Sequence, residues 1–274
     1  MAGTKALKWQ RRSVALFATL LAPACAFWEL SDWDAHEGAA PSTKVDSAPS
    51  NDPPDADLTD AATAPTDIAP PPPMSFQQES LPDLLYKGCA TTFIAESAPN
   101  QTGGALDQVS VDDDDPASSF KKKIILMRFD TSSVPQGSKV TGVTLHLNVT
   151  EKSSGNTNFE LFALSHAWSE ANATWLVSNT GVNWATPGAG ARQTSSVDRG
   201  NVPLASLLPT TTGPVDVVFN EAGRALVQLW VDQPDKNFGF LFDTLNTGDG
   251  LFLSSSRAAN ASADRPKLTI QFGL

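Results

Sequence analysis

The chain has 274 residues, of which 41% are hydrophobic and 18% charged, and its formal net charge is −11 at pH 7. This length accommodates one domain of ordinary size with extensions, or two small domains. The chain's two cysteines are too few for a disulfide-stapled scaffold, and the excess of acidic residues argues against a nucleic-acid partner because a duplex would be repelled.

Residues 1–25 have the pattern of a bacterial export signal. Residues 1–12 contain four basic residues and no acidic one, and an apolar run follows from Val14 to Leu21. That run is too short to span a bilayer, which distinguishes a signal peptide from a membrane anchor.

The end of this signal fits two processing reactions. Residues 24–26 (Ala-Cys-Ala) match a signal peptidase site of the A-x-A type, whereas residues 21–25 resemble a lipobox in which Cys25 is lipidated. A lipid on Cys25 would hold the protein at a membrane surface without a spanning helix. We therefore expect a secreted protein at the cell surface, and favour lipid anchoring to the bacterial envelope over free secretion.

Residues 26–80 are predicted to form a disordered linker. The segment is rich in alanine, proline, serine, threonine and aspartate, and it carries most of the chain's net negative charge. Such a sequence cannot bury enough apolar surface to offset the entropy lost on ordering. Prolines and like charges also extend the chain, so we expect a tether in front of the folded domain.

Residues 81–274 are predicted to form a single all-β domain, in which short β-rich runs alternate with turn residues. Between residues 143 and 150, apolar and polar residues alternate, as in a strand with one buried and one exposed face. The candidate strands cover 90–95, 105–111, 123–129, 140–149, 159–164, 215–219, 237–243, 251–255 and 267–272.

One helix is expected over residues 220–230. Asn220 suits the N-cap position, and Leu226, Leu229 and Trp230 have the i, i+3, i+4 spacing of an apolar face that covers one end of a sheet. Many short strands with a single short helix predict a jelly-roll-like antiparallel β-sandwich.

Three blocks of this domain resemble the DNRLRE (disaggregatase-related) family, which overlaps carbohydrate-binding module family 96. Residues 123–145 are similar to the family's core "LLRFDLSSIPxGxxVxSATL", residues 167–175 match "WxE…xTW", and residues 251–268 are similar to "FxSREA…RPxLxV". The string that names the family is absent, and Ala258 replaces the usual acid after the arginine. The resemblance implies a secreted β-sandwich module that binds acidic polysaccharide and has no catalytic residues.

Binding of such a ligand needs aromatic faces that stack on sugar rings and basic donors for carboxylates. Trp184 lies in a loop without apolar periodicity and is the candidate stacking platform. Trp168 and Trp175 lie inside a family block, and Trp230 lies on the apolar face of the helix, so these three are expected to be packing residues.

Four basic residues are candidate donors to carboxylates. Lys121 and Lys122 belong to the only basic run of the domain, Arg128 projects from the sheet face opposite an apolar row, and Arg257 lies in the third family block. Each has a structural alternative: the lysines would be the solvated start of a strand, and covered arginines would need buried acidic partners.

A metal or a catalytic centre is weakly indicated. Residues 112–115 are four consecutive aspartates, but neighbouring strand residues point to opposite faces and chelate calcium poorly, so a solvated acidic loop is favoured. Structural calcium elsewhere stays an open alternative, and no other cofactor is expected. No zinc, nucleophile-elbow or phosphate-loop motif is present, and Glu170 would be the first candidate for glycoside hydrolysis.

Together these features predict a non-catalytic extracellular module at the bacterial cell surface that binds polysaccharide, with uronate-rich polysaccharide as the favoured ligand. Two alternatives stay open. Well-buried arginines without an open groove would favour a structural or adhesive surface protein, and a cleft with converging titratable groups would favour a polysaccharide-degrading enzyme.

Overall fold

The computed structural model describes residues 70–152, 157–191, 196–244, 250–259 and 262–273. The predicted export signal with Cys25, and the predicted linker as far as residue 69, lie outside these residues. No helix in the described ranges is both long and apolar enough to cross a membrane.

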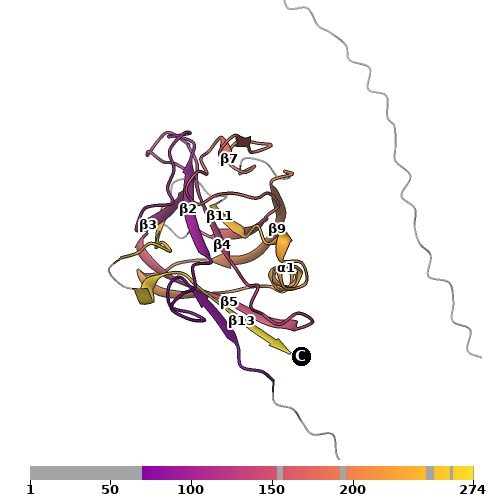
Figure 1. The fold of residues 1–274 in the computed structure, drawn as a ribbon. Helices are drawn as coiled ribbons and strands as arrows, with labels where there is room; N and C mark the ends of the chain where they lie inside the picture. The colour runs from indigo at the N-terminus through magenta and orange to yellow at the C-terminus, as the bar shows by residue number, and fades with distance from the viewer. Residues whose placement is uncertain (1–69, 153–156, 192–195, 245–249, 260–261, 274) are drawn as a thin grey trace, which may run out of the picture. The chain divides into compact units, whose positions relative to one another are not determined.

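The described residues form mainly antiparallel strands, as the sequence predicts for an all-β domain (Figure 1). The strands are β1 (Met74–Gln77), β2 (Cys89–Ala95), β3 (Gln108–Asp112), β4 (Lys123–Phe129), β5 (Lys139–Lys152), β6 (Phe159–Leu164), β7 (Val177–Asn179), β8 (Val182–Asn183), β9 (Arg199–Leu207), β10 (Gly213–Val218), β11 (Phe240–Thr244), β12 (Gly250–Ser254) and β13 (Lys267–Gly273). The helices are α1 (Glu221–Asp232) and two 3₁₀ helices, η1 (Pro234–Lys236) and η2 (Ser262–Asp264).

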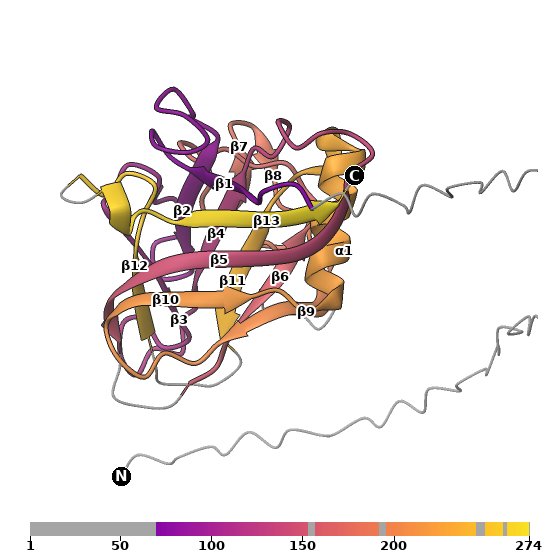
Figure 2. The same ribbon diagram turned by 90° about the horizontal axis from the view of Figure 1, so that it is seen from below.

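All strands except the β7–β8 hairpin join one sheet, in the order β1-β13-β5-β12-β3-β4-β11-β6-β9, with β10 also paired to β5 and β2 to β4. The sheet curls into two layers, which Figures 1 and 2 show crossing each other. We call β1, β13, β5 and β10 the β5 layer, and β2, β4, β11, β6 and β9 the β4 layer. The strands β3 and β12 connect the layers, because β12 pairs with β5 while β3 meets β4 at Asp112 and Lys123.

The main core lies between the two layers. Along β5, buried residues alternate with half-exposed ones, which confirms the period of two predicted from the sequence. The buried side chains Val143, Leu145, Leu147 and Val149 belong to the same cluster as Ile125, Met127 and Phe129 of β4.

Helix α1 closes one end of this core and starts where the sequence predicts. The side chain of Asn220 accepts a hydrogen bond from the backbone N–H of Gly223 at 3.0 Å, so Asn220 is the N-cap. Trp230 is fully buried, whereas Leu229 is 37% exposed and does not belong to the packed face. The buried residues of the helix are Gly223, Val227, Trp230 and Val231.

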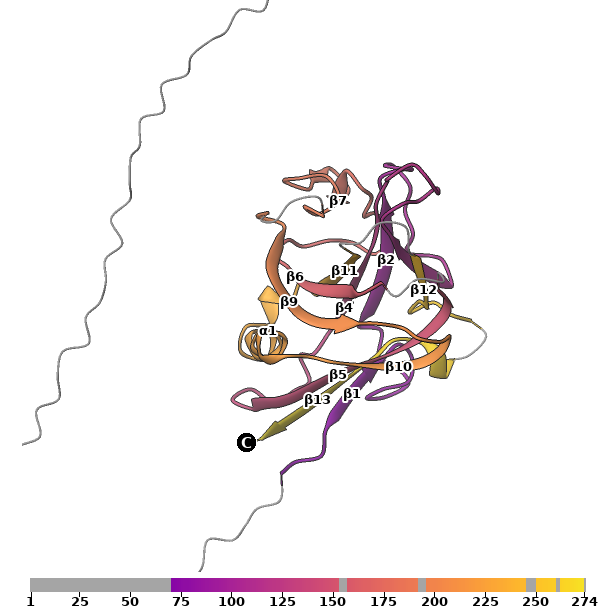
Figure 3. The same cartoon turned by 180° about the vertical axis from the view of Figure 1, so that it is seen from behind.

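A second core lies on the other face of the β4 layer. Ile124 and Leu126 of β4 point away from the main core and pack under residues 165–191, a segment after β6 that includes β7 and β8. Figure 3 shows this segment, marked by β7, beyond β6 and β11 on the side away from β5. The strand β4 is therefore buried on both faces.

Four of the described strands, β1, β7, β8 and β9, have no counterpart in the sequence prediction. β1 lies inside the segment predicted as linker, because Phe76 is fully buried in the main core and β1 pairs with β13. Order in the chain therefore begins before residue 81. The strand β9 is not predicted because Gly200, Asn201 and Pro203 interrupt the apolar pattern of a strand.

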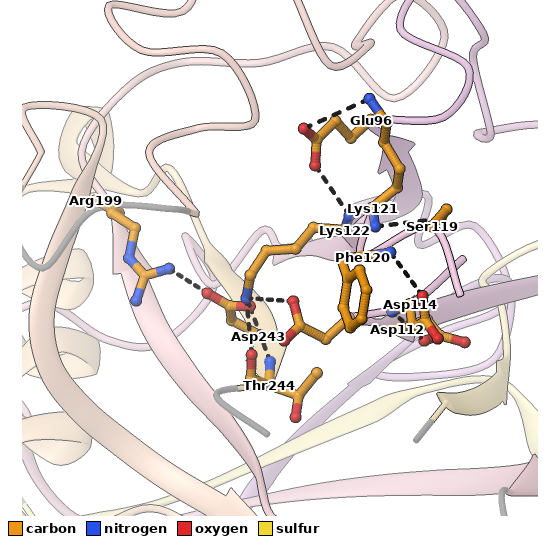
Figure 4. Close-up of polar contacts among 11 residues, drawn as sticks. Glu96, Asp112, Asp114, Ser119, Phe120, Lys121, Lys122, Arg199, Asp243 and Thr244 are labelled. Atoms are coloured by element: carbon orange, nitrogen blue, oxygen red, sulfur yellow. Dashed lines mark hydrogen bonds and ion pairs between the residues drawn. The ribbon is translucent and has the colours of Figure 1, made fainter. Parts of the chain in front are cut away.

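A buried ion-pair network joins the start of β4, the end of β11 and the start of β9 (Figure 4). Lys122 Nζ donates to Asp243 Oδ1 at 2.6 Å and to the carbonyl oxygen of Thr244 at 2.8 Å, and it lies 3.4 Å from Asp113 Oδ1. Arg199 Nη1 donates to Asp243 Oδ2 at 2.7 Å. Two cations thus face two carboxylates inside the fold, which is the arrangement that buried charges need.

The variant Asp243→Ala removes the carboxylate shared by Lys122 and Arg199. Because both cations then stay buried without that partner, we expect a loss of about 3–5 kcal/mol in the free energy of unfolding, measured by urea denaturation. The matched control is Asp235→Ala, which removes a 74% exposed partner of Lys236 and should cost less than about 1 kcal/mol. Equal losses for the two variants would contradict the role given to the network.

Candidate functional site

A groove lies on the outer side of β3 and β12, the strands that connect the two layers. Val109, Val111, Leu251 and Leu253 point into the main core, so the alternate residues of both strands face outward. Two adjoining cavities, of about 540 Å³ and about 420 Å³, share Asp107, and together they are called the β3–β12 groove. The first is lined by Phe93, Leu106, Asp107, Gln108, Ser110, Lys123 and Phe252. The second is lined by Thr102, Gly104, Ala105, Asp107, Glu170, Ala171 and Arg257.

The first cavity combines apolar side chains with a cation. Phe252 is half-buried, Leu106 is 46% exposed, and Lys123 Nζ lies 5.2 Å from the centre of the Phe93 ring. Gln108 is exposed and supplies an amide next to them. Apolar surface beside a cation and an amide is the combination that a sugar ring with polar substituents requires.

Glu170 organises the second cavity. Its Oε1 accepts hydrogen bonds from the backbone N–H of Thr91 and from Ser256 Oγ, both at 2.9 Å, while Oε2 pairs with Arg257. The hydrogen bond to Glu170 raises the pKa of the Arg257 guanidinium above its ordinary value. The side chain of Arg257 is 45% exposed. Arg257 is therefore a charged donor held in position at the surface of the cavity.

The same contacts bear on hydrolysis. The Glu170 carboxylate is occupied by three donors, one of them a guanidinium. Such a carboxylate suits the positioning of Arg257 better than the protonation of a leaving group, which requires a protonated acid.

The structure corrects the prediction for Trp184. This residue is only 4% exposed, packs in the second core and donates from Nε1 to the carbonyl oxygen of Thr174 at 2.9 Å. It cannot form an exposed stacking platform, because residues 165–191 fold back over the β4 layer and turn their tryptophan side chains inward. Trp168 and Trp175 are buried in the same core, as packing residues should be.

The two predicted lysines do not line the groove. Lys122 is buried in the ion-pair network, so its assignment as a polysaccharide contact is wrong. Lys121 keeps a 46% exposed side chain, 3.9 Å from Glu96, outside the groove. Their neighbour Lys123 does line the groove, because consecutive residues of a strand point to opposite sides.

The two predicted arginines lie at different places. Arg257 lines the second cavity of the groove. Arg128 lies on the outer face of the β4 layer, with its guanidinium carbon 5.5 Å from the centre of the Trp168 ring, and it lines a separate recess.

The acidic run at residues 112–115 serves local structure. Asp114 accepts hydrogen bonds from the backbone N–H groups of Phe120 and Ser118, both at 2.6 Å, and these bonds lower its pKa. Its two neighbours in the run form ion pairs with lysines at the start of β4. Within the described ranges, no group of three or more His, Cys, Asp or Glu side chains is placed to hold a metal ion.

Comparison with known proteins gives a family match for this part of the chain. The model of carbohydrate-binding module family 96 matches residues 86–186, which include Phe93, Lys123 and Glu170 of the groove but not Phe252 or Arg257. No curated protein matches the chain. The match supports a carbohydrate-binding module, which is a non-catalytic kind of domain.

The groove aromatics are the residues that sequence reasoning missed. Phe252 alternates with Leu251 and Leu253, two inward residues of β12, so the period of two already placed it on the outer face. Phe93 carried no such signal, since its position beside Lys123 depends on the pairing of β2 with β4.

Replacing Trp184 tests its new assignment as a core residue. Trp184→Ala should lower the free energy of unfolding by about 3–5 kcal/mol, because the cavity left in the second core cannot collapse fully. At a temperature where the variant is folded, retention on a polysaccharide affinity gel should equal that of the parent. Trp184→Phe serves as the milder control. If Trp184→Ala kept the parent's stability but lost retention on the gel, Trp184 would be an exposed stacking residue and its assignment to the core would be wrong.

Proposed function

We propose that the domain binds an extracellular polysaccharide along the β3–β12 groove, without cleaving it. The observation that carries this proposal is an open groove with large apolar side chains in its first cavity and a cation in each of its two cavities, Lys123 and Arg257. Most of its lining falls within residues 86–186, the range that matches a carbohydrate-binding module.

Different side chains of the groove would stack on the sugar rings and form hydrogen bonds with their hydroxyl groups. Phe252 and Leu106 offer apolar surface to the faces of sugar rings, whose C–H groups pack well against aromatic and aliphatic side chains. Gln108 in the first cavity and Thr102 in the second are exposed and suit the hydroxyl groups of the polymer.

The preferred ligand is an acidic, uronate-rich polysaccharide. A guanidinium carries five N–H donors, and Glu170 accepts from one of the two on Nη2 of Arg257, which leaves others for a ligand carboxylate. Lys123 is paired with Asp115, so its contribution is the smaller of the two. Because the contacts are charged and near the surface, binding should weaken as the salt concentration rises.

The cellular setting is also a proposal. The sequence pattern of residues 1–25 supports export, and lipidation of Cys25 would hold the protein at the bacterial envelope, with the acidic, proline-rich segment as spacer.

Affinity electrophoresis in gels that contain alginate tests the ligand and the groove together. Phe252→Ala and Arg257→Gln should each weaken retention roughly tenfold, through loss of a stacking surface and of a charged donor respectively. The control Phe120→Ala removes a 65% exposed aromatic outside the groove and should change nothing.

The salt dependence gives the second readout of the same experiment. Retention on alginate should fall with added salt, and any retention on a neutral glucan should not. Full retention of Phe252→Ala and Arg257→Gln would place the ligand elsewhere, and no retention of the parent on any polysaccharide would favour the structural or adhesive alternative.

A further inference from the structure

A separate recess of about 380 Å³ lies where β2 begins and β4 ends. It is lined by Lys87, Gly88, Ala90, Arg128, Asp130, Pro234 and Asn237, and none of these residues lines the β3–β12 groove. The recess opens on the outer side of the β4 layer, since Ala90 packs against the second core and pairs with Arg128.

Two cations of the recess lack an acidic partner. Among the described residues, no carboxylate forms an ion pair with Arg128 or with Lys87. The guanidinium of Arg128 is half-buried against the Trp168 ring, and Lys87 is exposed at the rim. Asp130 also lines the recess but pairs with neither cation, so an anion that enters beside Arg128 and Lys87 gains from both residues.

Hydrogen-bond acceptors lie beside these cations. The amide of Asn237 is held by its Nδ2, which donates to the carbonyl oxygen of Phe129 at 2.7 Å. Its Oδ1 is buried and accepts no hydrogen bond from the described part of the chain. Asp130 is exposed, and its Oδ1 accepts from the backbone N–H of Ser132 at 3.0 Å, which leaves the second carboxylate oxygen for a ligand.

The wall of the recess is held in place by close packing. The hydroxyl of Tyr86 donates to the carbonyl oxygen of Asp130 at 3.0 Å. A Cβ at Gly88 would lie 2.6 Å from Asp130 Cβ and 2.7 Å from the Tyr86 ring, so only glycine permits this approach.

We propose that the recess is a second binding site, which takes one sugar-acid unit. The carboxylate faces Arg128 and Lys87, and a ring hydroxyl donates to the exposed carboxylate of Asp130, whereas the enclosed Oδ1 of Asn237 takes no part. Acetate has no hydroxyl to offer Asp130 and a neutral sugar has no charge for the cations, so a hydroxylated carboxylate is the chemistry that satisfies both. This inference does not rest on the function proposed for the groove.

Titration of the protein with D-glucuronate, followed by NMR chemical-shift changes, tests the site. Glucose and acetate each carry half of the required chemistry and should bind roughly tenfold more weakly or worse. Arg128→Gln and Lys87→Ala should each weaken glucuronate binding by about tenfold. Lys139→Ala, which removes an exposed lysine of β5, should bind as the parent does.

The outcomes separate this site from the groove. Phe252→Ala should lose retention on alginate but bind glucuronate as the parent does. Lys87→Ala should be retained on alginate but bind glucuronate more weakly, and its unfolding curve should match that of the parent. The proposal is overturned if folded parent protein does not bind glucuronate, if Arg128→Gln and Lys87→Ala bind it as the parent does, or if acetate binds equally well. Loss of glucuronate binding in Phe252→Ala would also overturn it, by placing the ligand in the groove.

Discussion

Burial of β4 on both of its faces decides where this domain can bind a ligand. One face packs in the main core through Ile125, Met127 and Phe129, and the other packs under residues 165–191 through Ile124 and Leu126. That covering segment uses its tryptophans as packing residues, so the broad outer face of the β4 layer offers no open aromatic surface. The surfaces that we propose for ligands therefore lie on the connecting strands β3 and β12, whose outer face holds the groove, and at the recess at the end of β4.

The same burial explains the ion-pair network. Lysines lie at the entry to β4, where Lys122 precedes the strand and Lys123 begins it, and the two side chains point to opposite sides. Asp243 pairs with Lys122 through Oδ1 and with Arg199 through Oδ2. A single carboxylate therefore holds the entry to β4, the end of β11 and the start of β9 together. Buried pairs of this kind add little net stability over apolar packing, but losing one partner is expensive. We therefore infer that the network fixes the register of β4, β11 and β9 relative to one another.

Periodicity in the sequence predicts which residues share a face of a strand or helix. Most of the confirmed predictions about the fold rest on this periodicity. The strands at 123–129 and 159–164 match β4 and β6, and Asn220 caps the helix as expected. Periodicity does not reveal what covers a face. Trp184 is therefore misassigned, since its burial depends on a segment without regular pattern that folds over β4, and Lys122 is misassigned because its partner Asp243 lies far along the chain. Arg257 was found through a family block, whereas Phe252 needed only the alternation along β12.

The most direct test of this account is NMR mapping of a uronate oligosaccharide on the ¹⁵N-labelled protein. Backbone amides of Ser110, Lys123 and Phe252 should shift together as the oligosaccharide is added, while the indole Nε1–H signal of Trp184 stays in place. A large shift of the Trp184 indole, with no change along β3 and β12, would contradict the claims that Trp184 is a buried packing residue and that the polysaccharide binds in the β3–β12 groove.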